Sequence, residues 1–93
     1  MKIEEIIKKS CDLYNVQLHD LQSKSRKKNL VYARLLVCIA VYEKYDLNAF
    51  IESMNIINRD RTMAYHYLEV YNTQLKHCSD FKSKIQTING PNN

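Results

Sequence analysis

Apolar residues recur every three or four positions along most of this chain, which is the pattern of amphipathic helices. The first such stretch covers residues 2–14, and a short apolar run after Asn15 predicts one further turn of helix. Residues 30–45 are apolar on nearly every side, which is typical of a helix that other helices cover. The spacing therefore predicts a helical protein built around a central helix at residues 30–45.

The second half of the chain predicts a pair of helices joined by the four-residue link "NIIN". Asp46 is a good N-cap for a helix that carries apolar residues up to Met54. After the link, an apolar stripe runs from Ala64 to Leu75, and Ser79 is expected to cap a last helix. A short helix, a tight turn and a longer helix with a charged front form the sequence pattern of a helix-turn-helix, here at about residues 46–75.

Glycine and proline occur once each among the 93 residues. A β-rich fold of this size needs turn residues throughout, so their scarcity predicts an all-α domain of five or six helices over residues 1–89. Residues 90–93 are expected to form a disordered tail. Nucleotide binding of the P-loop or Rossmann kind is not expected, because the chain has no glycine-rich phosphate loop.

The net charge and the distribution of apolar residues limit the possible partners and cellular location of the protein. Fourteen Lys and Arg against ten Asp and Glu give a net charge of +4, which by itself only weakly indicates a nucleic-acid partner. No apolar run approaches the roughly 20 residues of a membrane span, and the N-terminus has no secretory pattern. We therefore expect a cytoplasmic protein that does not enter a membrane.

The cysteines and histidines do not predict an enzyme or a metal protein. The cysteines are odd in number and widely spaced, so we expect buried, reduced thiols. They are Cys11, Cys38 and Cys78. The three histidines lack metal-ligand spacing, and nothing supports a nucleophilic Cys/His pair over packed thiols. The expectation is no catalysis, no metal and no cofactor.

Two charged segments are the candidate binding elements. In "INRDRT" (residues 57–62) a helix start with nearby arginines can face a phosphate, and side chains of the first two turns can reach base edges. The alternative is two packed helices with charges exposed at one end. The run "SKSRKK" (residues 23–28) is either a phosphate clamp or a solvated link. Arg34 interrupts an apolar helix, so it either extends to the surface along its stem or shares one face with Arg26.

Two separated stretches resemble a known family. "DLQSKSRKKNLVYAR" (residues 20–34) and "NRDRT" (residues 58–62) look like motifs of the C-terminal DNA-binding domain, or domain IV, of the bacterial chromosomal replication initiator DnaA. Both motifs and the distance between them agree, and the resemblance covers about residues 3–88. It implies a fold of the Trp-repressor-like helix-turn-helix group.

The resemblance assigns roles residue by residue. Arg26 matches the loop arginine that enters the minor groove, and Arg34 matches a DNA-contacting arginine of the long helix. Asp60 and Thr62 match residues that read bases from the recognition helix, and Arg59 matches the arginine before them.

Three positions depart from the family pattern. Arg61 replaces a histidine, Met63 replaces the second threonine, and Ile57-Asn58 replaces a glycine pair. Asn58 is expected to take the left-handed conformation, which Asn tolerates better than most residues. The departures lie where base identity is read, so the resemblance implies DNA binding without implying the family's usual DNA sequence. The chain also lacks an ATPase segment, so it is expected to be either a fragment of a longer initiator or a free-standing module, and the initiating Met1 and short ending favour the free-standing module.

We therefore expect a module that binds double-stranded DNA with sequence selectivity. It is expected to bind no nucleotide, and a monomer is favoured. The alternative is a helical protein-interaction domain that kept the fold and lost specific DNA recognition. The predicted DNA-binding residues are Lys24, Arg26, Lys27, Lys28, Arg34, Arg59, Asp60, Arg61, Thr62 and His66.

Overall fold

The computed structural model describes residues 2–90, and within this range the chain is helical with no strand. Its elements are α1 (Ile3–Tyr14), α2 (Leu18–Gln22), α3 (Lys28–Lys44), α4 (Leu47–Ile56), α5 (Met63–Val70), the π-helical turn η1 (Tyr71–Leu75) and α6 (Ser79–Asn89). The expected all-α fold is confirmed. Residues 91–93 of the predicted tail lie outside the described part.

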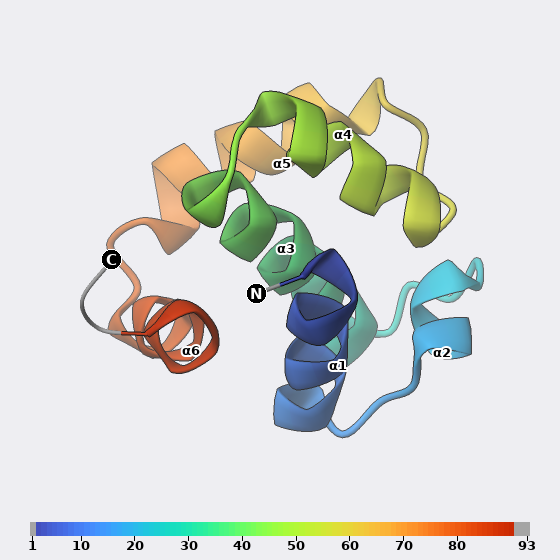
Figure 1. Cartoon of the computed structure of the whole chain (residues 1–93), viewed down its shortest axis with the longest axis horizontal. Helices are drawn as coiled ribbons and strands as arrows, with labels where there is room; N and C mark the ends of the chain where they lie inside the picture. Colours follow the sequence, from blue (N-terminus) through green and yellow to red (C-terminus); the bar gives the residue numbers. More distant parts are fainter. Residues whose placement is uncertain (1, 91–93) are drawn as a thin grey trace.

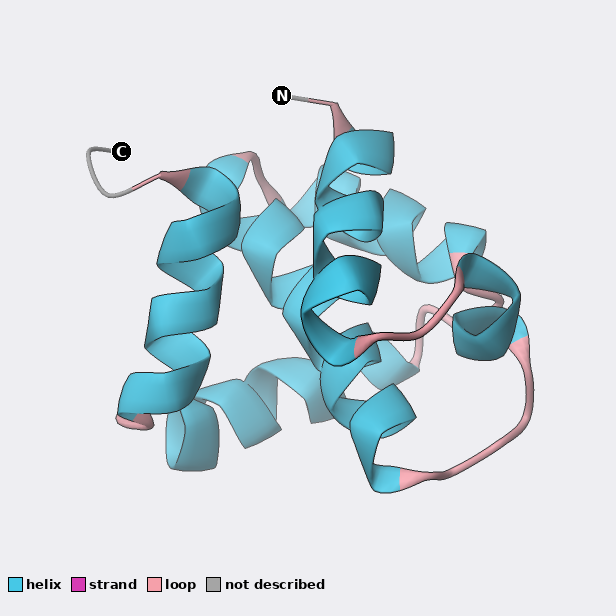
Figure 2. Cartoon of the chain, turned by 90° about the horizontal axis from the view of Figure 1, so that it is seen from below, coloured by secondary structure: helices cyan, strands magenta, loops and turns pink. Residues whose placement is uncertain are grey.

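Helix α3 runs through the middle of the molecule, and the other helices surround it (Figures 1 and 2). Helices α1, α4 and α6 make the most extensive contacts with it. Every residue of α3 from Ala33 to Val41 is buried, which is why its sequence is apolar on all sides. The predicted central helix is confirmed.

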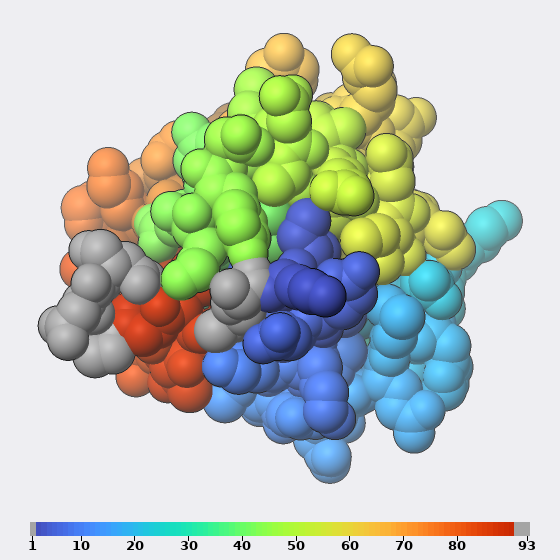
Figure 3. Space-filling model, viewed as in Figure 1, coloured from blue at the N-terminus to red at the C-terminus, as the bar shows by residue number. Residues whose placement is uncertain are grey.

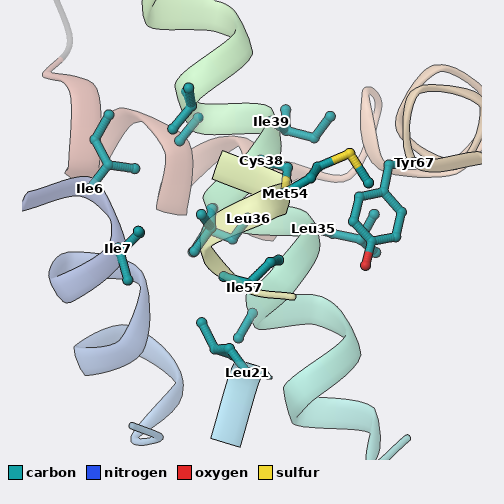
Figure 4. Close-up of a cluster of buried hydrophobic side chains, with 14 of the residues drawn as sticks. Ile6, Ile7, Leu21, Leu35, Leu36, Cys38, Ile39, Met54, Ile57 and Tyr67 are labelled. Atoms are coloured by element: carbon teal, nitrogen blue, oxygen red, sulfur yellow. The ribbon is translucent and has the colours of Figure 1, made fainter. Parts of the chain in front are cut away.

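The core joins residues from all parts of the described chain. Ile6 of α1, Leu21 of α2, Phe50 and Met54 of α4, and Ile57 after α4 are all fully buried. Figure 4 shows labelled side chains from α1, α2, α4 and α5 converging on α3. Burial of this apolar surface is the main source of stability for a helical domain of this size.

Local signals set several helix ends. The Asp46 side chain accepts a hydrogen bond from the Ala49 N–H at 2.9 Å, which confirms the predicted N-cap of α4. The prediction for the last helix was wrong by one residue. Ser79 is already helical, and Cys78 occupies the N-cap without a side-chain hydrogen bond.

The second helix of the helix-turn-helix starts later than its charged front suggested. Asn58 has a φ of 58°, which confirms the expected left-handed turn residue. Asp60 then closes a local turn by accepting the Thr62 N–H at 3.0 Å. Helix α5 begins only at Met63. Arg59 and the residues up to Thr62 therefore lie in the turn that leads into α5.

The apolar face of α5 agrees with the sequence pattern only in part. Ala64, Tyr67 and Leu75 are buried, while Leu68 and Tyr71 are half-buried against the core. At Tyr71 the helix widens into η1, which shifts the face that follows. In the described part of the chain, no helix is both long and apolar enough to cross a bilayer.

Candidate nucleic-acid interface

Two segments far apart in the sequence line one groove of about 550 Å³, called here the basic groove. One segment is the loop between α2 and α3, and the other is the turn before α5 together with the first turns of that helix. In Figures 1 and 3 the loop between α2 and α3 (cyan) lies at the right-hand edge, and the turn before α5 (yellow) lies above it at the upper right. The residues that line the groove are Lys24, Ser25, Arg26, Val31, Arg34, Arg59, Met63, His66 and Tyr67.

Arg34 lies at the inner end of this groove, and its residue surface is only 3% exposed. Its guanidinium donates four hydrogen bonds to backbone carbonyls of the preceding segment. The acceptors are Leu21 O at 2.8 Å, Ser25 O at 2.8 Å, Ser23 O at 3.0 Å and Asp20 O at 3.2 Å. A guanidinium has five N–H groups, so most of its donors are used inside the protein.

These bonds explain why a charged residue interrupts the central helix. Residues 23–27 form no regular structure, so their carbonyls need partners from elsewhere in the protein. The Arg34 guanidinium is the partner of Ser23 O and Ser25 O, and it also binds two carbonyls at the end of α2. Burial lowers the pKa of Arg34, and the nearby positive charge of Arg59 lowers it further. Extension of the side chain into solvent is therefore excluded, and the predicted direct contact between Arg34 and DNA gains no support from this geometry.

Two further side chains hold the basic loop against the helix-turn-helix. The Arg59 guanidinium donates to Ser23 O at 2.6 Å, across 36 positions in the sequence. The Gln22 amide donates to Ile56 O at 2.9 Å. Since Ser23 O also accepts from Arg34, one carbonyl connects the loop, the long helix and the turn before α5. The two candidate DNA-binding segments are therefore held in a fixed relation to each other.

Tyr67 contributes an aromatic wall to the groove. The residue is buried, and its hydroxyl lies at the outer edge of the core cluster in Figure 4. Burial raises the pKa of Tyr67, while the positive charges of Arg59 and Arg34 partly oppose that rise. The tyrosine therefore stays neutral at physiological pH, and the charge of the groove comes from its cations.

The remaining basic residues of the loop face solvent. Lys24, Arg26, Lys27 and Lys28 are exposed. Within residues 2–90 the only ion pairs are His19 with Asp20 and Lys84 with Asp80, so no carboxylate neutralises these cations. Their positive charge is available to an external anion.

The front of α5 is equally exposed. Asp60, Arg61, Thr62 and His66 all face solvent, and only His66 reaches the basic groove. The Asp60 carboxylate accepts the Thr62 N–H, but it forms no ion pair with either neighbouring arginine. In the described part of the chain the Asp60 carboxylate therefore does not hold an arginine in place.

Comparison with known proteins gives one match. Over 86 residues, or 92% of the chain, the sequence is 30% identical to the chromosomal replication initiator protein DnaA of Nautilia profundicola. The predicted resemblance to DnaA is confirmed. The chain spans 20% of the length of that DnaA protein, so the match concerns one domain-sized part of it. No family model and no solved structure matches the chain.

The DnaA-like motifs lie at the two sides of the basic groove. Five of the ten predicted residues line it, namely Lys24, Arg26, Arg34, Arg59 and His66. The other five flank it on the loop and on the front of α5, namely Lys27, Lys28, Asp60, Arg61 and Thr62. Gln22 and Tyr67 were not predicted from the sequence. Gln22 is a polar residue on a short helix and Tyr67 is part of the apolar stripe, and neither feature indicates a position beside the basic groove. No group of three or more potential metal ligands occurs within residues 2–90.

Proposed function

We propose that this DnaA-like chain is a module that binds double-stranded DNA with sequence selectivity. The observation that carries the proposal is the fixed pairing of an exposed, unneutralised basic loop with the exposed front of α5. The spacing is held by the bonds from Arg34, Arg59 and Gln22. A helix-turn-helix needs this combination, because backbone contacts set its position while the second helix reads base edges.

The basic loop is proposed to supply the contacts with the DNA backbone and the minor groove. Lys24, Lys27 and Lys28 are flexible, exposed point charges suited to phosphates. Arg26 lies in the groove lining and takes the minor-groove position that the DnaA resemblance implies. Arg59 adds positive charge from the opposite wall, while one arm of its guanidinium holds Ser23.

The front of α5 is proposed to enter the major groove. Arg61 is exposed and has a planar fork that matches the two acceptors of guanine. Thr62 and Asp60 can donate to or accept from neighbouring base edges, and His66 lies one turn further along the helix. Arg34 acts as a positioning residue that shapes the loop from inside the protein, in place of the direct DNA contact implied by the family.

A titration of labelled duplex at several salt concentrations, with random-sequence competitor, tests the proposal. If Lys24, Arg26, Lys27, Lys28 and Arg59 each neutralise about one phosphate, the log–log salt slope is near −4 to −5. Lys27→Ala should reduce the slope by about 1. Lys82→Ala in α6 is the matched control, because it removes the same charge at an exposed position that is not part of the groove lining.

Absence of duplex binding at about 50 mM salt would reject the proposal and favour the alternative, an interaction domain that lost DNA recognition. We also propose that the chain binds duplex DNA as a cytoplasmic monomer and needs no nucleotide to do so. Addition of ATP with Mg²⁺ should leave the duplex affinity unchanged, and light scattering should give the mass of a single chain.

Arg59 and Arg61 test selectivity separately. Arg59→Ala should weaken binding to all duplexes about equally, whereas Arg61→Ala should cost roughly 1–3 kcal/mol on the preferred site and relax the choice at one base pair. Arg61→Lys should recover little of that loss, because lysine lacks the fork. Equal weakening of preferred and random duplexes by Arg61→Ala would instead make Arg61 a phosphate contact.

A further inference from the structure

Tyr65 is the most exposed large hydrophobic residue in the described part of the chain. It is 81% exposed, whereas the other exposed large hydrophobic residues range from 37% to 51%. It lies on α5, and its neighbours Ala64 and Tyr67 point into the core. Tyr65 lies three residues after Thr62 and four after Arg61, and both of these residues are also exposed, in the turn that leads into α5.

Tyr65 makes none of the specific contacts by which a tyrosine stabilises a fold. Its hydroxyl makes no hydrogen bond and its ring makes no aromatic contact within residues 2–90. Other tyrosines of the chain do have partners. Tyr71 donates to Glu43, Tyr42 packs edge-on against Phe50, and Tyr14 lies under the Lys84 ammonium. A tyrosine ring can bury about 150–250 Å² on contact, so leaving it free in water forgoes that stabilisation.

We infer that Tyr65 is a specificity-determining residue whose ring contacts the methyl group of a thymine in the major groove. The inference rests on the proposed function, and it adds a residue and a base type that the proposed function leaves open. In the major groove only thymine presents a methyl group, and apolar side chains recognise it by direct contact. The exposed ring in the first turn of α5, directly after the exposed Arg61 and Thr62, has the chemistry for this contact.

The position of the thymine follows from the short chain between the two residues. The Ala64 N–H donates to Arg61 O at 3.0 Å, so the chain from Arg61 to Tyr65 forms one tight turn that advances roughly 6–8 Å. Base pairs of B-DNA are about 3.4 Å apart. The thymine should therefore lie within about two base pairs of the guanine assigned to Arg61.

Replacement of thymine by deoxyuridine tests the inference, because it removes only the methyl group. The full chain first selects its preferred site from a pool of random duplexes, and each thymine of that site is then replaced in turn. One replacement should weaken wild-type binding roughly three- to fivefold, the effect of losing contact with one methyl group. The same replacement should leave the affinity of Tyr65→Ala unchanged.

Two further variants sharpen the test. Tyr65→Phe keeps the ring and should keep the deoxyuridine effect. Tyr45→Ala is the matched control, since Tyr45 is 44% exposed at the opposite end of α3 from the basic loop and should bind as wild type does.

The outcomes separate this inference from the proposed function. A wild-type chain that binds no duplex rejects the proposed function itself. Duplex binding in which no deoxyuridine replacement has an effect, or in which Tyr65→Ala shows the same effect as wild type, overturns the role of Tyr65 alone. A selected site without thymine also overturns it.

Discussion

Replacement of Arg34 by lysine separates a positioning role from a charge role. Lysine keeps the positive charge and most of the aliphatic stem, but it presents three donors from a single nitrogen. The Arg34 guanidinium now reaches four carbonyls from three nitrogen atoms, at 2.8 to 3.2 Å. A single ammonium cannot take the positions of all three nitrogens, so part of this carbonyl set loses its partner in Arg34→Lys.

The size of the effect follows from that loss. If lysine keeps about two of the bonds, two partly buried carbonyls lose their donor, at roughly 1–3 kcal/mol each. Arg34→Lys should therefore lower the free energy of unfolding by about 2–6 kcal/mol. The domain should remain folded at low temperature, because most small domains have 5–15 kcal/mol of stability.

Urea unfolding followed by far-ultraviolet circular dichroism measures this change. The m-value should stay the same, since the surface exposed on unfolding is unchanged. Lys27→Arg is the control, because Lys27 is exposed in the same loop and its exchange should stay within about 0.5 kcal/mol. Amide exchange should also become faster in the loop of residues 23–27 of Arg34→Lys.

Duplex affinity completes the comparison. A residue that only presented charge to a phosphate would tolerate lysine, whereas a residue that shapes the loop would not. Arg34→Lys should thus weaken binding to preferred and random duplexes alike, at a temperature where the variant is folded. A variant with wild-type stability and wild-type affinity would refute the positioning role.

Further experiments test the fold and its thiols. Asp46→Ala should cost about 1 kcal/mol through loss of the α4 N-cap, and an unchanged melting temperature would contradict the cap. Phe50→Ala should cost about 3–5 kcal/mol, while Thr62→Ala should stay within about 0.5 kcal/mol in the same urea assay. Burial raises the pKa of Cys38 to about 12 from an ordinary value of 9.0, so iodoacetamide should modify the half-buried Cys78 first, as mass spectrometry can show. Because Cys38 is neutral in the fold and ionises more readily when unfolded, its contribution to stability is complete below about pH 9 and is lost between about pH 9 and 12.

Features that depend on local sequence could be predicted. The apolar pattern located α1, α3 and α4, because burial of one face of a helix gives periodic apolar residues and burial on all sides gives a continuous apolar run. Asp46 and Asn58 were also predictable, since an N-cap and a left-handed turn depend on a residue's own chemistry and its nearest neighbours.

Features that depend on residues far away in the sequence could not be predicted. The acceptors of Arg34 lie 9 to 14 residues earlier, two in α2 and two in the loop after it, and no periodicity of the sequence indicates them. The bond from Gln22 to Ile56 spans 34 positions. The late start of α5 depends on the turn that Asp60 closes, and the half-burial of Leu68 depends on how α5 packs against the core. Sequence alone therefore identified the candidate segments but not how they are fixed together.

The carbonyls gathered around Arg34 also bear on the entropy of binding. The backbone of the loop at residues 23–27 is already ordered in the free protein, so its conformational freedom is lost during folding and not during association. What a duplex must still immobilise is the set of exposed lysine and arginine side chains, at about 0.5–1.5 kcal/mol each. Removal of the Arg34 bonds would shift the ordering of that backbone from the folding reaction to the encounter with DNA. Calorimetry of duplex binding by such a variant would then record a larger entropic penalty than in the wild type for the same set of contacts.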